Sequence, residues 1–422
     1  MKENSIFKPC DVLLPDFSKV DANKWAVIAC DQYTSEPHYW NKVEKIVGDN
    51  PSTLNIILPE IYLKESKERI PKINATMENY LNGVFKVYKD AVIYTERVQK
   101  DGLVKHGVML AVDLEEYDFS KGSTSLIRAT EGTVIERIPP RVEVRKDATI
   151  ESPHVMLLID DDKDIVIKPL TDNKNEFLKL YDFELMMDGG SVTGYLVSNE
   201  MVKRLKSSIL SLISDENAQR LYGKNAPSKL LFAVGDGNHS LATAKTCYEN
   251  VKRELGEEKA KNHPSRYALV EVVNLNDKAL EFEPIYRVMF NVDVNDVIEE
   301  LKKYLNTLSG SEAPQTIKVL TNSSEVNLVA KNPTKQLTVG TLQDFIDDYL
   351  KSHQGEVDYI HGEDSVKSLI SQPNSIGFIF TGMQKNELFK TVIFDGALPR
   401  KTFSIGHAYD KRYYLECRKI KD

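Results

Sequence analysis

The sequence predicts an α+β protein with mixed sheets, and three observations lead to this prediction. Residues 85–118 contain short apolar runs on either side of the turn Lys100-Asp101-Gly102, which is typical of antiparallel strands. Residues 198–213 carry an apolar side chain at every fourth position, which is typical of an amphipathic helix. Residues 230–273 combine an apolar run, a glycine-containing turn, a helical pattern and a second apolar run, which together indicate a β–turn–α–β unit.

The chain has 422 residues, more than one ordinary core accommodates, so several domains are expected. We predict an N-terminal α/β lobe at 1–190, the β–turn–α–β unit within 191–310, and a C-terminal α/β segment at 311–422 that returns to the site. Prolines and polar residues around 312–317 suggest a linker. Apolar residues make up 41% and charged residues 28% of the chain, as in folded globular proteins.

Charge and patterning limit the classes of partner. The formal net charge of −8 argues against a chain whose main partner is nucleic acid, because such proteins need a basic surface. We find no signal-peptide pattern and no stretch near the roughly 18 apolar residues of a spanning helix, so no membrane partner is expected. The cysteines are too widely spaced for a zinc site and are interpreted as reduced thiols. The prediction is a cytoplasmic protein, and its oligomeric state is left open.

The first elements follow the apolar runs in order. Residues 25–30 indicate a short strand, the polar stretch 31–37 follows it, and a helix is expected from about Tyr39. Strands are expected at 87–88, 91–94 and 108–112, the last after the turn at 100–102. A further strand is expected at 156–159, just before Asp160-Asp161-Asp162.

The middle and last thirds are predicted in the same way. Ser198 is the expected N-cap of a helix that buries Met201, Leu205, Ile209 and Ile213. A strand at 230–234, a helix from about Ser240 that stops at Gly256, and a strand at 267–273 complete the central unit. In the last third we expect a helix over 342–350 capped by Thr341, followed by strands at 376–380 and 391–394.

The strongest candidate site is the turn Gly235-Asp236-Gly237-Asn238-His239-Ser240. The unpaired N–H groups and the dipole of a helix start attract phosphate, and Gly235 and Gly237 let the backbone approach a ligand closely. Asp236 could act as a base or metal ligand, and His239 could contact phosphate or transfer a proton. An ordinary strand–helix turn capped by Asn238 or Ser240 is the alternative. The pattern is neither a P-loop nor a full dinucleotide motif.

Basic side chains elsewhere could complete an anion site. Arg128 and Glu131 lie in a loop between strands, Arg141 follows two prolines, and Arg287 lies beyond the strand at 267–273. For each isolated arginine, a solvated surface charge is the alternative. The tail from 398 to 414 combines basic and hydroxyl side chains with small and aromatic residues, which favours an anion pocket. Its candidates are Arg400, Lys401, Thr402, Ser404, His407, Lys411 and Arg412.

Carboxylates at two other places are weaker candidates. Asp31, Thr34, Ser35 and Glu36 follow the apolar run at 25–30, where a carboxylate could orient or deprotonate a substrate hydroxyl. An acidic first turn of a helix explains the same residues. The run at 160–162 could bind magnesium carried by a nucleotide, but a solvated turn is the simpler explanation. No resident metal site is predicted.

The turn resembles the Asp-Gly-His-His-Arg signature of the bacterial family known as domain of unknown function 1015. Blocks at 28–37, 128–133, 152–157, 283–287 and 398–418 are also similar to that family, so the resemblance covers most of the chain. Around the turn, the family is similar to the ParB/sulfiredoxin-like superfamily, which includes ParB proteins, sulfiredoxin and ADP-dependent free serine kinases. Asn238 and Ser240 stand where His and Arg are usual. The lost arginine means that another basic residue must supply its charge, or that the site binds something else.

The resemblance implies phosphoryl transfer or phosphate-ester hydrolysis on a small metabolite, with serine or phosphoserine as substrate and an adenine nucleotide and Mg²⁺ as cofactors. Asp236, His239 and Glu36 would be catalytic. The turn would hold phosphate together with Arg128, Lys401 and Arg412. The expected substrate-binding residues are Asp31, Thr34, Ser35, Glu131, Arg141, Arg287, Thr402, Ser404 and His407. The alternative is a non-catalytic nucleotide-sensing regulatory protein, and a ParB-like DNA partner is disfavoured by the net charge.

Overall fold

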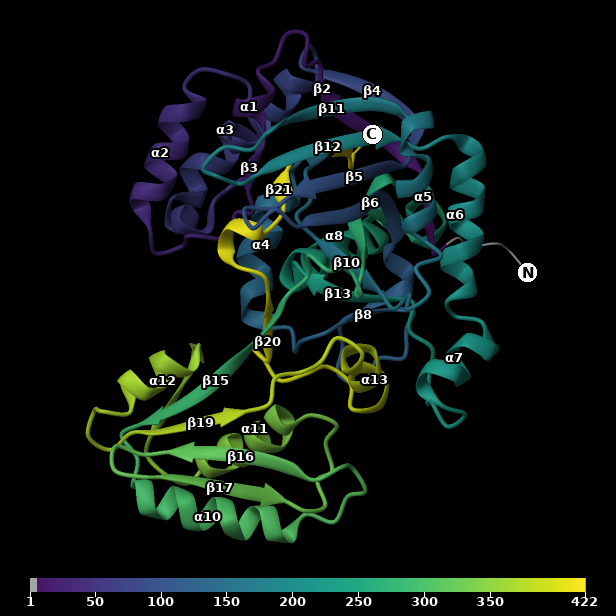
Figure 1. Cartoon of the computed structure of the whole chain (residues 1–422). Helices are drawn as coiled ribbons and strands as arrows, with labels where there is room; N and C mark the ends of the chain where they lie inside the picture. The colour runs from purple at the N-terminus through teal and green to yellow at the C-terminus, as the bar shows by residue number, and fades with distance from the viewer. Residues whose placement is uncertain (1–5, 422) are drawn as a thin grey trace. The chain divides into compact units, whose positions relative to one another are not determined.

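The computed structural model describes residues 6–421, and its fold is α+β with mixed sheets, as predicted. The chain forms two compact units (Figure 1). Unit 1 contains the chain up to Ala129, Thr133–Leu280 and the chain from His407 onward, and unit 2 contains Thr130–Gly132 and Glu281–Gly406. Both units are therefore discontinuous in sequence, whereas the predicted segments 1–190, 191–310 and 311–422 are continuous. No helix within 6–421 is long and apolar enough to cross a membrane.

A ten-stranded mixed sheet is the centre of unit 1. Strands β5 (Ile93–Val98) and β6 (Val104–Asp113) form an antiparallel hairpin across the turn at 100–102, which confirms that prediction. The strand order is β11 (Leu178–Glu184), β12 (Ser191–Leu196), β5 (Ile93–Val98), β6 (Val104–Asp113), β14 (Tyr267–Asn274), β10 (Met156–Ile159), β13 (Phe232–Asp236), β8 (Ile127–Ala129) and β7 (Tyr117–Asp118), with β1 (Phe7–Lys8) paired to β6.

Apolar side chains from both faces of this sheet form two cores, because successive residues of a strand point to opposite faces. On one face pack α5 (Lys168–Asn173), α6 (Asn199–Ser211) and α8 (Asn238–Leu255). On the other pack α2 (Pro37–Val47), α3 (Ser66–Leu81) and the pair β2 (Cys10–Pro15) and β4 (Phe85–Ala91) (Figure 1). Helix α6 confirms the predicted pattern, because the Ser198 hydroxyl accepts from Met201 N–H and the helix buries Met201, Leu205 and Ile209.

Two small strand pairs bind the last residues of the chain to unit 1. Strand β21 (Tyr413–Tyr414) pairs with β3 (Val27–Ile28), and β22 (Arg418–Lys419) pairs with β9 (Ile150–Glu151). The remaining helices of the unit are α1 (Ala22–Trp25), α4 (Ile138–Arg145), α7 (Asp215–Tyr222) and α9 (Glu257–Ala260).

The elements of the predicted β–turn–α–β unit are present, but their pairing is not that of neighbouring strands. Strand β10 lies between β13 and β14, antiparallel to the first and parallel to the second. The two strands around α8 therefore run in opposite directions. Strand β13 extends to Asp236, so Gly235 and Asp236 belong to the strand, and α8 begins at Asn238, two residues earlier than predicted. It ends at Gly256, as predicted.

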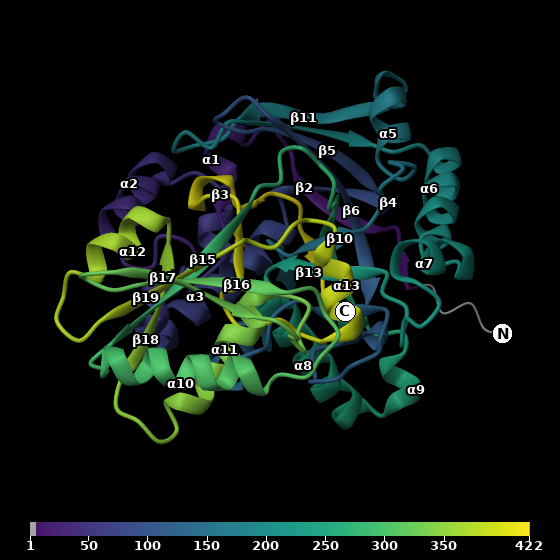
Figure 2. The same cartoon turned by 60° about the horizontal axis from the view of Figure 1, so that its bottom comes forward.

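Unit 2 is built on a six-stranded sheet in the order β17 (Glu325–Ala330), β16 (Gln315–Leu320), β19 (Ile376–Phe380), β15 (Phe282–Phe290) and β18 (Glu356–His361), with β20 (Phe403–Ile405) paired to β15. Helices α10 (Val294–Thr307) and α11 (Thr338–Tyr349) pack together beside β16 and β17 through Tyr304 and Phe345 (Figure 2). The other helices are α12 (Glu363–Leu369) and α13 (Glu387–Phe394).

Three local predictions in unit 2 are wrong. Residues 391–394 belong to α13 rather than to a strand, because apolar residues at 388, 389, 392 and 393 line one face of a helix. Helix α11 begins at Thr338, so Thr341 is not its cap; the Thr341 hydroxyl instead donates to Gln315 Oε1 at 2.7 Å. The suggested linker at 312–317 overlaps β16, which pairs with strands on both sides.

Candidate functional site

Four segments that are distant in sequence converge where β13 ends. They are the loop after β3, the residues before β10, the first turn of α8 and the C-terminal segment 407–414. The C-terminal segment is fixed there by main-chain pairing, because Tyr413 is opposite Ile28 and Ala29 N–H donates to Arg412 O at 3.0 Å. The tail thus returns to the turn within unit 1.

The turn itself exposes the start of a long helix. Gly237 is the N-cap of α8 and has φ of +79°, a conformation that glycine adopts without strain. No side chain caps this helix, and Gly237 N–H donates to Asp236 Oδ1 at 2.9 Å. The first-turn N–H groups are therefore not used by a side-chain cap and can donate hydrogen bonds to an anion. A Cβ at Gly237 would lie 3.0 Å from Val155 Cα, so the turn also packs closely.

Lys411 supplies positive charge at this turn. Its Nζ lies 3.4 Å from Asp236 Oδ2, and both side chains are largely buried, at 14% and 20% exposure. The sequence predicts this role for Arg128, Lys401 and Arg412. Arg412 instead pairs with the buried carboxylates of Glu271, at 3.0 Å, and Glu416. Lys105 pairs with the same Glu271 at 3.1 Å, so Arg412 belongs to a buried ionic network beside the site.

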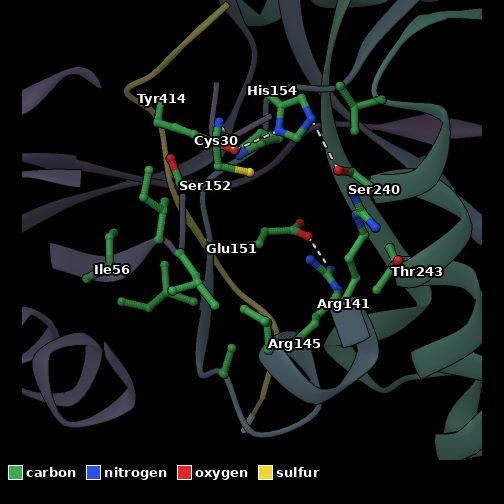
Figure 3. Close-up of a pocket in the computed structure, with 18 of the residues that line it drawn as sticks. Cys30, Ile56, Arg141, Arg145, Glu151, Ser152, His154, Ser240, Thr243 and Tyr414 are labelled. Atoms are coloured by element: carbon green, nitrogen blue, oxygen red, sulfur yellow. Dashed lines mark hydrogen bonds and ion pairs between the residues drawn. The ribbon is translucent and has the colours of Figure 1, made fainter. Parts of the chain in front are cut away.

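His154 connects three of the converging segments. It is buried, and its Nε2 lies 3.2 Å from Ser240 Oγ and 3.8 Å from Asp31 Oδ2. Its Nδ1 lies 2.8 Å from the Tyr414 hydroxyl (Figure 3). Burial acts to raise the pKa of Asp31, but the charge of His154, a hydrogen bond from Gln32 and the charge of Lys411 outweigh it and lower that pKa. Asp31 is therefore a carboxylate at neutral pH.

His239 presents a neutral imidazole to the site. Its Nε2 accepts a hydrogen bond from Val134 N–H at 3.3 Å. Burial, followed by the charges of Arg141 and Arg137, lowers its pKa to about 4. The proton of the neutral ring is then on Nδ1, which can donate to a ligand.

Arg141 lies on the other side of the first turn of α8. It comes from α4, and its guanidinium points toward Ser240 (Figure 3). It forms an ion pair with Glu60 and donates to Arg137 O at 2.8 Å. Lys411 and Arg141 therefore give the start of α8 two cations, where the family signature carries one arginine at the position of Ser240.

A cavity of about 170 Å³ adjoins this turn (Figure 3). Ser240 and Thr243 of α8 line it together with His154, Tyr414 and Cys30. Most of the remaining wall is apolar and includes Ile56, Leu58, Met77, Val144, Ala148 and Leu269. Burial raises the pKa of the Cys30 thiol to about 12, so the thiol stays protonated. The site thus combines a charged end at the helix start with an apolar interior.

Arg128 is buried away from the turn. Its guanidinium donates to Lys229 O at 2.6 Å and to Ser123 O at 3.4 Å, and burial lowers its pKa to about 10. Lys229 precedes β13 and Ser123 precedes the parallel strand β8, whereas the turn follows β13. Thr34, Ser35 and Glu36 are exposed at the start of α2, where the Glu36 carboxylate lies 3.7 Å from His38 Nε2.

Several of the other predicted residues belong to unit 2 and make contacts there. Arg287 is fully buried and donates to Gln343 Oε1 at 2.7 Å and Lys401 O at 3.0 Å. Thr402 donates to Pro399 O and Ser404 to Gly406 O. Glu131 forms a bridge with Leu398. His407, at the start of the last segment of unit 1, caps the short turn Ala408–Asp410.

Sequence reasoning did not select His154 or Tyr414 as site residues, and among the basic residues of the tail it ranked Lys401 and Arg412 above Lys411. His154 lies in the block 152–157, which resembles the family, and Lys411 and Tyr414 lie in the basic and aromatic tail. The family block and the composition of the tail were the signals in the sequence that point to these residues. The contacts that these three residues make at the site span 86 to 260 positions, so local pattern could not rank them.

Comparison with known proteins identifies a family that covers most of the chain. Residues 14–349 match the family described as "Protein of unknown function (DUF1015)", and no curated protein matches. Similar solved structures include a free serine kinase in complex with AMP, at 12% identity and a TM-score of 0.36 over 74% of this chain and 91% of that one. A conserved hypothetical protein from Pyrococcus furiosus has 12% identity and a TM-score of 0.34 over 74% and 95% of the two chains.

Proposed function

This chain belongs to the DUF1015 family, and from that premise we propose that it catalyses phosphoryl transfer to, or phosphate-ester hydrolysis of, a small metabolite. The observation that carries the proposal is the Asp236–Lys411 pair at the uncapped start of α8. Helix N–H groups and a cation bind a phosphoryl group, and a carboxylate beside them can accept a proton.

Phosphate binding is the first step of the proposal. The first-turn N–H groups of α8 would donate to phosphoryl oxygens, and Lys411 and Arg141 would neutralise their charge. Both cations are partly paired with carboxylates, Asp236 and Glu60 respectively, which holds them in place before a ligand binds. Preorganised donors of this kind account for most of the protein's contribution to phosphoryl transfer. The Nδ1–H of His239 would provide a further neutral donor.

Proton transfer is the second step. Asp236 is our candidate for the group that accepts the substrate hydroxyl proton, or that aligns water in the hydrolytic direction. Asp31 stays ionised beside His154, and its part is to hold that imidazole toward Ser240. Glu36 is exposed at the start of α2 and is a weaker candidate than Asp236 for the base.

An adenine nucleotide and Mg²⁺ complete the proposal as cofactors implied by the family resemblance. Mg²⁺ is commonly bound through one or two carboxylates together with substrate phosphates, and Asp31 and Asp236 are the carboxylates of this site that would hold it. The ion would neutralise phosphate charge at the start of α8. Serine and phosphoserine are the first substrates to test for the same reason of resemblance.

A non-catalytic nucleotide sensor is the competing function, and turnover separates the two. We would incubate the protein with ADP or ATP, Mg²⁺ and a panel of hydroxylated metabolites that includes serine, and in parallel with phosphoserine alone. Phosphorus NMR would follow the products, with the Asp236→Asn variant as the control. Phosphorylated product or phosphate release that depends on Asp236 supports the enzyme. Tight nucleotide binding without turnover across the panel overturns it in favour of the sensor.

A further inference from the structure

The cavity beside α8 has a mostly apolar interior and polar side chains at its mouth. At the mouth stand Ser240 and His154, and the walls behind them come from the segment 56–58, α3, α4, β9 and β14. Most of the interior side chains are aliphatic or thioether groups, among them Ile56, Met77 and Val144, and the paired side chains of Glu151 and Arg145 also line the cavity. A ligand held by its phosphoryl group at the start of α8 has this apolar space next to it.

The hydrogen bonds of its lining side chains limit which ligands the cavity can bind. Its polar side chains are already engaged: Thr243 donates to His239 O at 2.7 Å, Ser152 donates to Glu416 O at 3.1 Å, and Ser240 contacts His154. Glu151 accepts from Leu269 N–H and Arg418 and pairs with Arg145. None of the lining side chains carries a buried polar atom without a partner.

The lining therefore favours a hydrocarbon group over a purine. A buried purine needs partners for its ring nitrogens and exocyclic groups, and leaving them unpaired costs about 1–3 kcal/mol for each group. A hydrocarbon group has no such requirement and gains from leaving water. The size agrees, because an apolar cavity of roughly 150 Å³ holds benzene, and this cavity measures about 170 Å³.

We infer that this cavity binds an apolar substituent, about the size of a phenyl ring or a branched alkyl group, on the metabolite whose phosphoryl group is bound at the start of α8. The inference rests on the proposed function for the location of the phosphoryl group, and it names the substrate class. The substrate is then a hydroxylated or phosphorylated metabolite that carries a hydrocarbon group, and serine lacks one.

The test compares phenyl phosphate with inorganic phosphate by titration calorimetry on the full chain. We expect phenyl phosphate to bind at least about tenfold more tightly, on the scale of burying one large apolar side chain. Val144→Phe should fill the cavity, abolish that preference and leave the affinity for inorganic phosphate unchanged. The matched control is Val142→Phe on the same helix, since Val142 does not line the cavity, and it should keep the preference.

A second variant keeps the test decisive if Val144→Phe fails to fold. Val144→Ala enlarges the cavity, so the preferred ligand should shift from phenyl phosphate toward 1-naphthyl phosphate. Equal affinities for phenyl phosphate and inorganic phosphate in the wild type would overturn the inference. So would an unchanged preference in the Val144 variants.

A phosphate-free probe separates this inference from the proposed function. Benzyl alcohol should raise the melting temperature of the wild type and of Val142→Phe, but not of Val144→Phe. If inorganic phosphate does not bind while this pattern holds, the proposed phosphoryl site fails and the apolar site stands. If phosphate binds and benzyl alcohol has no effect on the wild type, the apolar site fails and the proposed function stands.

Discussion

At the scale of single residues, two neighbours in the C-terminal segment have different surroundings. Lys411 reaches Asp236 at the start of α8, while Arg412 enters the buried network of Glu271 and Glu416. Adjacent side chains of an extended segment point in opposite directions, so one residue of register decides which cation faces the ligand. The basic tail could be recognised in the sequence, but this register could not.

We predict that replacing Lys411 affects phosphate binding, whereas replacing Arg412 affects stability. Lys411→Met should weaken inorganic phosphate binding by about 1.5–3 kcal/mol, the scale of a charge-assisted hydrogen bond, with little change in the free energy of unfolding. Arg412→Met should lower the free energy of unfolding by about 3–5 kcal/mol, because buried Glu416 loses its ion-pair partner and buried Glu271 keeps only Lys105. Calorimetry and urea unfolding measure the two quantities. Unchanged phosphate affinity in Lys411→Met would remove Lys411 from the site.

A second prediction is that replacing Asp236 lowers turnover but leaves the melting temperature almost unchanged. Asp236→Asn keeps the shape of the side chain and its contact with Gly237 N–H, so the melting temperature should change by only a few degrees. Turnover should fall by at least about a hundredfold, as expected when a general base is lost. A variant with wild-type turnover would exclude Asp236 as the base. A large fall in melting temperature would make it a structural residue.

His239 makes stability depend on pH in a defined window. Its pKa in the folded protein is about 4, below the ordinary value of 6.5, so the unfolded chain binds more protons between these values. Stability should therefore rise with pH from about 4 to about 6.5 and be lost as the pH falls through that window. The slope should stay below about 1.4 kcal/mol per pH unit, the limit for one proton. His239→Gln should reduce this slope in urea unfolding series; an unchanged slope would assign it to other groups.

At the scale of elements, helix α8 has a glycine at each end, and one of these glycines lies at the candidate site. Gly237 and Gly256 have φ of +79° and +80°. Gly237 packs against Val155 and begins the helix at the proposed phosphate site, whereas a Cβ at Gly256 would meet nothing within 4 Å. The two positions therefore share a positive φ, which strains any residue other than glycine, and differ in their surroundings.

Alanine at these two glycines should separate stability from binding. Both substitutions should lower the free energy of unfolding by about 1–3 kcal/mol, the cost of a strained backbone position. Only Gly237→Ala should also weaken inorganic phosphate binding, because it moves the first-turn N–H groups. Equal phosphate affinity in the two variants would show that the start of α8 does not bind the anion.

Element prediction from sequence succeeded where the pattern is local. The hairpin of β5 and β6 and helix α6 follow from turn residues and apolar spacing, and both are confirmed. The strand predicted at 391–394 is wrong because four residues cannot distinguish a strand from one turn of α13. The separation of β13 from β14 by β10 could not be predicted, since sheet order depends on contacts between distant segments.

At the scale of the whole molecule, unit 1 closes only when the segment from His407 onward returns to it. Arg97 is the main side-chain anchor of that return, because its guanidinium donates to the carbonyls of Tyr409, Asp410 and Lys411 as well as Gly189. It is almost fully buried. The position of Lys411 at the site therefore depends on a residue of β5.

Replacing Arg97 should lower both the free energy of unfolding and the affinity for phosphate. Arg97→Met removes the donors to four carbonyls, so we expect the free energy of unfolding to fall by about 3 kcal/mol or more. Phosphate affinity should fall as well, because Lys411 loses its support. Arg204→Met, in an exposed pair with Glu200, is the control and should change stability by less than about 0.5 kcal/mol. A destabilised Arg97 variant with full phosphate affinity would show that Lys411 is held by other contacts.

The discontinuity of unit 1 also has a consequence for protein synthesis. Between Leu280 and His407 the ribosome must translate residues 281–406, all of unit 2 except Thr130–Gly132. At about 5–20 residues per second, that interval lasts roughly 6–25 s. Throughout it, unit 1 lacks β21, β22 and the cations Lys411 and Arg412, so Glu271 has Lys105 as its remaining cation. The proposed phosphoryl site is thus among the last parts of the protein to form, and a chain interrupted during translation of unit 2 would carry the turn without its lysine.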